Sequence, residues 1–382
     1  MYRLRNAGLL LALTLPAWPT CSYGSEPVPS TIRVCLRHAQ RTFNIGCTGS
    51  FNYQSGTAGT AIKSKGRQSV MPISGGSAIG NRRFHGVVTV SPEKPTDLLM
   101  LDGRRYRGVI QLIPAGRRQV DVVEIVSLDE YLQGVLPKEM GPEWPLEALK
   151  AQAVASRSYA LAARAEDPDR SYDVVSDVHD QVYGGVESES PASNQAVRET
   201  HGQILMTRDG KPVQAFFHSS CGGRTEMPGD VWDSRASFLG FAPVSDSFCK
   251  EDPYRQWTLT LSPDSITRRL RRAGIRIGTV KTVKAVKRSS SDRVTQFLVA
   301  GSRGKAFVQG NRFRLALGPE ILRSTLLTEI SQNRKGFHFE GRGWGHGVGL
   351  CQWGARGRAL AGQKHEEILK AYYSEASLVS QP

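Results

Sequence analysis

The chain has 382 residues, with 50 Lys and Arg against 35 Asp and Glu, a formal net charge of +15. Hydrophobic residues make up 39% and charged residues 22%, a balance typical of soluble globular proteins that excludes disordered, collagen-like and membrane-embedded chains. The length indicates two domains, and the positive charge favours anionic partners. We expect no nucleic-acid partner, because the basic residues are spread along the chain without the interleaved aromatics of a single-strand binder.

Residues 1–24 have the layout of a bacterial signal peptide. Arg3 and Arg5 precede an apolar run of about a dozen residues, which is followed by small residues up to Gly24. This run is shorter than the ~20 residues that a membrane-spanning helix needs. We therefore predict an exported protein of the periplasm, or of the cell wall and extracellular space. A lipidated Cys21 is the alternative, although the residues before it are not the small ones usual at such a cysteine.

Residues 25–100 are predicted to form a small β-rich N-terminal accessory region. Short β-type runs at 31–34 and 86–90 alternate there with stretches of Gly, Ser, Thr and Pro. The alternation of apolar and polar residues strengthens from residue 105 onward, and we place the main domain at 101–378. The whole chain is predicted to be an α+β protein in which β structure predominates.

One long, alanine-rich helix is predicted in the middle of the chain, over residues 145–164. Alanine is the best helix former, and Pro145 suits a first helical turn. Because alanine permits close packing, this central helix is expected to be buried and to bear active-site residues. Lys150 and Arg157 fall on one face of it, and two cations on a mostly apolar helix need anionic partners. Glu147 in the first turn is predicted to be structural and to pair with Lys150.

Glu139 is the strongest candidate for acid chemistry. It lies just before the alanine-rich helix, beside Met140 and Trp144. Apolar neighbours of this kind desolvate a carboxyl group and raise its pKa, as a general acid requires. A surface or capping glutamate is the alternative that this segment alone leaves open.

Two later segments have the composition of a ligand site. The first is residues 218–225, which begins with His218, and the second is the glycine-rich stretch 343–355. In the second, glycines on both sides of Trp344 and His346 allow sharp turns close to a ligand, and an indole face can stack on a sugar. This composition fits a carbohydrate groove, while a hairpin with a structural histidine is the alternative.

Six cysteines fit an exported protein, since thiols outside the cytoplasm tend to be paired. Loss of Cys21 with the signal peptide leaves five. We predict two disulfides and one free thiol among them: Cys35 with Cys47, Cys221 with Cys249, and Cys351 unpaired. His218 with Cys221 and Cys249 also resembles part of a zinc site, but disulfides are preferred, so we expect no metal and no cofactor.

Three segments in this order, residues 131–161, 218–225 and 343–355, resemble the stage II sporulation protein D (SpoIID) / LytB domain family. The resemblance runs from about residue 105 to residue 373. It includes the pattern Gln-x-Tyr-x-Gly at 181–185 and Arg-x-x-Leu-Gly at 314–318. The N-terminal quarter of the chain lies outside it.

Characterised members of that family are peptidoglycan lytic transglycosylases, which break the bond between N-acetylmuramic acid and N-acetylglucosamine and leave a 1,6-anhydro sugar. The resemblance implies that Glu139 acts first as acid and then as base, because the 6-hydroxyl of the substrate attacks in place of water. It also implies that Arg157 orients Glu139 or binds a substrate anion. Further matching or neighbouring positions are expected to bind substrate: Lys150, His218, Trp344, His346 and Gln352.

The resemblance leaves a second function open. Some family members are named amidase enhancers and are non-catalytic regulators that bind the wall and stimulate another hydrolase. The expected partners are therefore peptidoglycan glycan strands, most simply peptide-stripped ones, and in the second case a cell-wall amidase. Zinc occurs in some relatives near the segment that matches 218–221, but the ligand set of this chain looks incomplete. A role in sporulation is not implied, since the family is widespread in bacteria that never sporulate.

Overall fold

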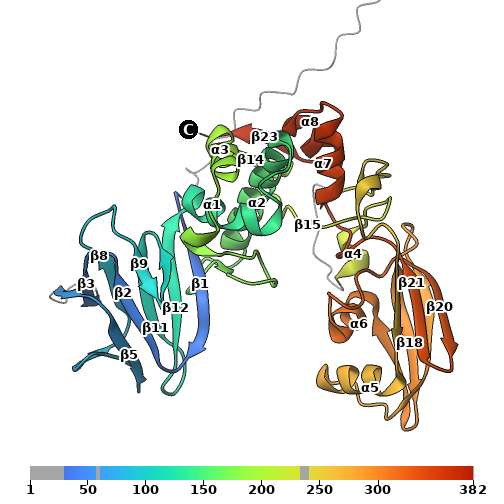
Figure 1. Cartoon of the computed structure of the whole chain (residues 1–382), viewed down its shortest axis with the longest axis horizontal. Coiled ribbons are helices and arrows are strands. Elements are labelled where there is room, and N and C mark those ends of the chain that lie inside the picture. The colour runs from blue at the N-terminus through green and yellow to red at the C-terminus, as the bar shows by residue number, and fades with distance from the viewer. Residues whose placement is uncertain (1–29, 57–60, 233–240, 382) are drawn as a thin grey trace, which may run out of the picture.

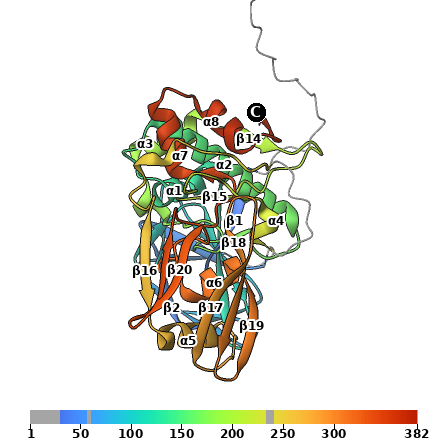
Figure 2. The same ribbon diagram turned by 90° about the vertical axis from the view of Figure 1, so that its right-hand side faces the viewer.

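The computed structural model describes residues 30–56, 61–232 and 241–381. The predicted signal peptide lies outside these residues. Helices and strands are mixed and strands predominate, in agreement with the predicted fold class. Most of the helices gather at one end of the molecule (Figures 1 and 2). Two sheet-containing units extend from them, one on each side, and one of these units carries helices of its own (Figure 1). Within the described ranges, no helix is long and apolar enough to cross a membrane.

The N-terminal unit contains two sheets whose inward residues alternate with outward ones, as in Ile32 and Val34 or Val88 and Val90, all fully buried. The larger sheet has the order β13-β1-β12-β11-β8-β3-β4 and the smaller one β10-β9-β2-β5-β6-β7. The strands are β1 (Thr31–Gln40), β2 (Phe43–Cys47), β3 (Ser50–Ser55), β4 (Ile62–Lys65), β5 (Gln68–Ile73), β6 (Gly76–Ile79), β7 (Arg82–His85), β8 (Val88–Pro92), β9 (Leu99–Leu101), β10 (Arg104–Tyr106), β11 (Val109–Pro114), β12 (Val120–Ser127) and β13 (Val174–Val175).

The predicted boundary near residue 100 does not separate two units. It falls within β9, which pairs with β2 on one side and with β10 on the other. In the larger sheet, β1 pairs with β12 and β8 with β11. The accessory region and the start of the predicted main domain therefore share both sheets, because alternating apolar residues continue across the boundary and bury the same faces.

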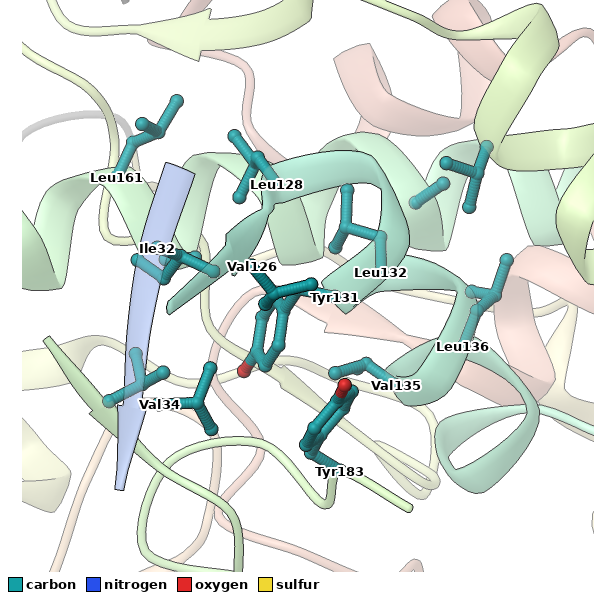
Figure 3. Packing of buried hydrophobic residues seen from close by; sticks show 14 of the residues in the cluster. Ile32, Val34, Val126, Leu128, Tyr131, Leu132, Val135, Leu136, Leu161 and Tyr183 are labelled. Atoms are coloured by element: carbon teal, nitrogen blue, oxygen red, sulfur yellow. The ribbon is translucent and has the colours of Figure 1, made fainter. Parts of the chain in front are cut away.

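The alanine-rich segment forms α2 (Leu146–Glu166), whose residues are buried almost without interruption from Ala148 to Leu161. It contacts helices on several sides, which small side chains permit. Figure 3 shows α1 packed on β1 and β12 and against Tyr183. The elements of this central layer are α1 (Leu128–Glu139), η1 (Gly185–Ser188), α3 (Pro191–Glu199), β14 (Gln203–Met206), α7 (Gln352–Leu360), α8 (His365–Tyr372) and β23 (Ser377–Ser380).

A second hydrophobic core, which the sequence did not predict, lies in a unit between residues 257 and 341. This unit has two three-stranded sheets, β16-β21-β20 and β17-β18-β19. It is inserted between β15 (Phe217–His218) and β22 (Leu350–Cys351), which pair in parallel. Its elements and those leading to it are α4 (Pro228–Val231), η2 (Cys249–Glu251), β16 (Trp257–Leu261), α5 (Pro263–Arg272), β17 (Val280–Arg288), β18 (Val294–Gly301), β19 (Gly304–Gln309), α6 (Gly310–Leu317), β20 (Leu327–Asn333) and β21 (Gly336–Gly341).

Glu124 on β12, in the larger sheet of the N-terminal unit, is a fully buried carboxyl group. The Tyr183 hydroxyl donates a hydrogen bond to its Oε1 at 3.3 Å, and its Oε2 has no partner among the described residues. Burial raises the pKa of Glu124 to about 8. The folded protein therefore keeps a proton that the unfolded chain releases at lower pH, so stability falls as pH rises from about 5 to 8.

Glu124→Gln, which stays neutral at every pH, is expected to remove this part of the pH dependence. The wild-type free energy of unfolding should fall by about 1.4 kcal/mol per pH unit more steeply than that of the variant between pH 5 and 8. Urea unfolding at several pH values measures the difference, with the exposed Glu166→Gln as control. Parallel curves for wild type and Glu124→Gln would show that Glu124 does not carry the effect.

Candidate active site

Glu139 is the last residue of α1 and lies where three distant segments meet. The backbone N–H of Val182 donates a hydrogen bond to its Oε1 at 3.1 Å. The side chain of Gln352, the first residue of α7, makes a second hydrogen bond to the carboxyl group. The predicted acid, the 181–185 pattern and the glycine-rich segment 343–355 therefore contribute to one site.

The pKa of the Glu139 carboxyl group is raised toward neutral pH. Burial raises its pKa to about 7, and the hydrogen bonds from Val182 and Gln352 offset the effect of burial only in part. No neighbouring carboxylate contributes to this shift among the described residues. A group with such a pKa can donate a proton and take one back at the same pH, as acid and base catalysis require.

The loop that supplies Val182 is held against α1 by two tyrosines. The Tyr131 hydroxyl donates to Oε1 of Gln181 at 3.1 Å, and the rings of Tyr131 and Tyr183 lie 5.1 Å apart. A Cβ atom at Gly134 would lie 2.3 Å from the Tyr183 ring. Only glycine at 134 therefore lets this loop approach α1 closely enough to place the Val182 N–H on Glu139.

Two indoles follow residues of this site in the chain and contact each other: Trp144 comes shortly after Glu139, and Trp353 directly follows Gln352. The rings of Trp144 and Trp353 are 5.0 Å apart at an interplanar angle of 59°, and both are partly exposed. The guanidinium of Arg356 lies over them, at 5.9 Å from the first ring and 5.4 Å from the second. The sequence pattern alone did not predict Trp353 as a site residue. Its position directly after Gln352 was the signal available in the sequence.

Arg157 contacts Asp129 and not Glu139 in the structure, and its predicted role in the active site stays a prediction. Arg157 is 2% exposed, and its Nη2 donates to Oδ1 of Asp129 at 3.0 Å. Its other hydrogen bonds within the described chain go to the backbone carbonyls of Gln203 and Val197. Arg157 therefore joins α2 to the first turn of α1, to α3 and to β14. Any influence on Glu139 passes through α1, which carries Asp129 at one end and Glu139 at the other.

Lys150 is engaged in ion pairs within the chain, and its predicted role as a substrate ligand stays a prediction. Its Nζ lies 3.0 Å from Oε1 of Glu147 and 2.6 Å from Oε2 of Glu199. The predicted pairing with Glu147 is confirmed, and Glu147 also accepts a hydrogen bond from the backbone N–H of His365 at 2.8 Å. Both cations of the predicted face thus have acidic partners within the chain.

His218, His346 and Trp344 lie at the junction with the inserted unit. His218 is 4% exposed, its Nδ1 is 3.0 Å from the carbonyl of Val348, and burial lowers its pKa. Its ring is 5.5 Å from that of His346, whose pKa burial lowers to about 3. The ring centroids of Trp344 and Tyr254 are 4.6 Å apart, and the two rings are nearly perpendicular. The two histidines contact each other and Trp344 contacts Tyr254, whereas Gln352 contacts Glu139 directly.

The predicted disulfides are not formed. The cysteines within the described ranges are all free and buried, and the Sγ atoms of Cys221 and Cys249 are 3.6 Å apart, against ~2.05 Å in a disulfide. Cys351, predicted to be solitary, lies with them, because β22 pairs with β15. With Asp246 these three cysteines form a group whose ligand atoms all lie within 4.8 Å of one another.

Two family models match different parts of the chain. The family model described as Stage II sporulation protein (SpoIID) matches residues 116–206, which contain α1, α2 and the 181–185 loop. A model described as a domain of unknown function (DUF8618) matches 238–349, the region of the inserted unit. The fold and these matches define the class as a SpoIID-type protein with a second, inserted unit.

Several relatives share most of the chain. An uncharacterized protein of Brachyspira hyodysenteriae is 32% identical over 74% of this chain and 74% of its own length. The stage II sporulation protein D of Bacillus amyloliquefaciens is 30% identical over 68% of this chain and 76% of its own length. The amidase enhancer of Bacillus subtilis is 29% identical over 78% of this chain but only 48% of its own length. The chain therefore belongs to the SpoIID family.

Proposed function

We propose that this chain is an exported lytic transglycosylase that cleaves the bond between N-acetylmuramic acid and N-acetylglucosamine in peptidoglycan glycan strands. The observation that carries the proposal is Glu139, whose pKa is raised to about 7 and which is held by Val182 and Gln352 from two other motif segments. Ordinary glycosidases need a second carboxylate for water or for a covalent intermediate. A transglycosylase does not, because the nucleophile is part of the substrate.

The proposed reaction has two proton transfers through one side chain. Protonated Glu139 gives its proton to the glycosidic oxygen as the bond from C1 breaks, and the N-acetylglucosamine end leaves as an alcohol. The Glu139 carboxylate then takes the proton of the 6-hydroxyl, whose oxygen bonds to C1 and closes the 1,6-anhydro ring. Intramolecular attack of this kind is favoured because its geometry is set in advance. The donors on Val182 and Gln352 stabilise the intermediate carboxylate.

Two features support a glycan substrate. The partly exposed faces of Trp144 and Trp353 offer surfaces on which sugar rings stack. The net charge of +15 suits a strand stripped of its peptides, where each muramic acid exposes a lactyl carboxylate. We propose that His218, Trp344 and His346 support the glycan-binding surface from the junction with the inserted unit and do not transfer protons.

Product analysis tests the proposal. The chain from residue 25 onward is incubated with peptide-free glycan strands, and the fragments are analysed by mass spectrometry. Fragments with anhydro ends are expected. Fragments with reducing ends would identify a hydrolase, and intact strands would refute the cleavage reaction on this substrate.

The pH dependence of cleavage gives a second check. Because Glu139 must carry its proton to act as acid, the rate of cleavage is expected to fall tenfold per pH unit above about pH 7. Initial rates between pH 5 and 9 measure the profile. A rate that fell instead from about pH 4.5 upward would indicate a carboxyl group with an ordinary pKa and would exclude Glu139 as described here.

A second function is favoured by one relative, the amidase enhancer of Bacillus subtilis. In this case the chain would bind wall glycan and stimulate a separate amidase. The two functions differ in what they require of Glu139. Stimulation of a purified amidase on intact sacculi by both wild type and Glu139→Gln, without anhydro products, would favour the enhancer.

A further inference from the structure

A cluster of three thiols and one carboxyl group lies next to the candidate active site, since one of its thiols, Cys351, directly precedes Gln352. The proposed reaction does not use this cluster. Cys221 follows β15, Asp246 and Cys249 lie in the segment before β16, and Cys351 ends β22. All four side chains are at least nine-tenths buried. One ligand atom from each lies within 4.8 Å of every other.

The distances within this cluster fit the edges of a coordination polyhedron. The Sγ of Cys221 is 3.6 Å from that of Cys249 and 3.6 Å from Oδ2 of Asp246. A tetrahedral zinc ion with Zn–S bonds of ~2.3 Å separates its sulfur ligands by ~3.8 Å. A disulfide would need ~2.05 Å. Because all four ligand atoms lie within 4.8 Å of one another, the cluster is more than one close pair of cysteines.

Backbone donors point at the sulfur atoms. The N–H groups of Cys221 and Gly354 donate to the Sγ of Cys351 at 3.2 and 3.3 Å, and that of Gly223 donates to the Sγ of Cys221 at 3.4 Å. Such hydrogen bonds stabilise thiolates, the form in which cysteine binds metals. Buried thiolates side by side in turn require a cation between them.

The carboxyl group has the surroundings of a metal ligand. Oδ2 of Asp246 accepts a hydrogen bond from the Tyr372 hydroxyl at 2.7 Å, and Oδ1 accepts one from the N–H of Phe248 at 3.0 Å. These bonds fix its orientation, as outer partners of ligating carboxylates do. A Cβ atom at Gly354 would lie 2.1 Å from Oδ2 of Asp246 and 2.0 Å from the Tyr372 oxygen. Glycine at 354 thus lets α7 close over the cluster.

We propose that Cys221, Cys249, Cys351 and Asp246 bind one zinc ion that fixes the start of α7. Three sulfur ligands favour zinc over magnesium or calcium, which prefer oxygen. The ion joins the segments that carry Cys221, Cys249 and Cys351, which are far apart in the sequence. Cys351 is the N-cap residue of α7 and directly precedes Gln352, so the ion also positions the donor to Glu139. This last effect rests on the proposed function, whereas metal binding does not.

Metal content tests the site directly. The chain from residue 25 onward is purified without added metal, and its zinc is measured by mass spectrometry. We expect one zinc per chain in the wild type and in Cys47→Ser, a buried cysteine outside the cluster, and loss of zinc in Cys249→Ser. Asp246→Asn should keep the three sulfur ligands and bind zinc at least about 10-fold more weakly. A metal-free wild type with a Cys221–Cys249 disulfide, or zinc retained in Cys249→Ser, would overturn the proposal.

Cobalt reports on the same site even if the serine variant fails to fold. Cobalt(II) exchanged into the wild type should show sulfur-to-cobalt charge transfer and intense bands of a tetrahedral site. An octahedral spectrum without charge transfer would contradict the assigned ligands. Glu139→Gln is expected to keep its zinc, so loss of cleavage in that variant separates failure of the catalytic proposal from failure of the metal site. Removal of zinc from the wild type should lower the cleavage rate about 10-fold or more through Gln352.

Discussion

Glu139→Gln is expected to lower the rate of glycan cleavage by about 10²- to 10⁴-fold, the range that a general acid contributes. An amide cannot donate the proton that the glycosidic oxygen needs. It has the same size as the carboxyl group and keeps an oxygen to accept the hydrogen bond from Val182, so the local structure should persist. Initial rates on peptide-free strands, with strand binding measured separately, give the comparison.

Glu143→Gln serves as the matched control, since Glu143 lies in the short segment between α1 and α2 and is exposed. Its cleavage rate should equal that of the wild type. Glu139→Gln should still bind strands with wild-type affinity and show an unchanged circular dichroism spectrum. Cleavage by Glu139→Gln at more than a tenth of the wild-type rate would eliminate this carboxyl group as the acid.

Arg157→Ala is expected to destabilise the protein by about 3 kcal/mol, as the loss of one partner from a buried ion pair does. The substitution removes the hydrogen bonds from Arg157 to Asp129 and to the carbonyl of Gln203, and it leaves a cavity inside the helical layer. Urea unfolding measures the change. The exposed Arg198→Ala on α3 should alter stability by less than about 0.5 kcal/mol.

This experiment also decides between two roles for Arg157. If the residue acts through the packing of α1, the loss of activity in Arg157→Ala should disappear at temperatures well below its unfolding transition. Full stability combined with a large loss of activity would instead indicate that Arg157 contacts the substrate, one of the two roles that the family resemblance implied.

Local sequence was sufficient to predict the central helix and the buried setting of Glu139. The alanine-rich run and Pro145 specify α2 without help from distant residues, and Met140 and Trp144 indicated an apolar setting for Glu139. The partners of Arg157 were not predictable in this way. Asp129 is 28 residues away on another helix, and nothing in the spacing shows which acid the arginine meets.

The cysteine cluster shows the same limit more strongly. Cys221 and Cys351 are 130 residues apart, and only the parallel pairing of β15 with β22 brings them together. Spacing suggested disulfides because neighbouring cysteines in the sequence are the simplest partners. The inserted unit was missed because its strands have the same alternation as those around them, while its separate core depends on which faces pack together.

The pairing of β15 with β22 also bears on the order in which the molecule assembles. The helix bearing Glu139 and its supporting loop are close in sequence, so they can collapse early, whereas Gln352 must return across the whole inserted unit. Closing a loop of 130 residues has an entropic cost, and the pairing of two residues per strand offsets only a small part of it. We therefore expect the inserted unit to fold first and bring its two ends together. Gln352 then reaches Glu139 only late in folding, and glycan cleavage should not begin before that contact forms.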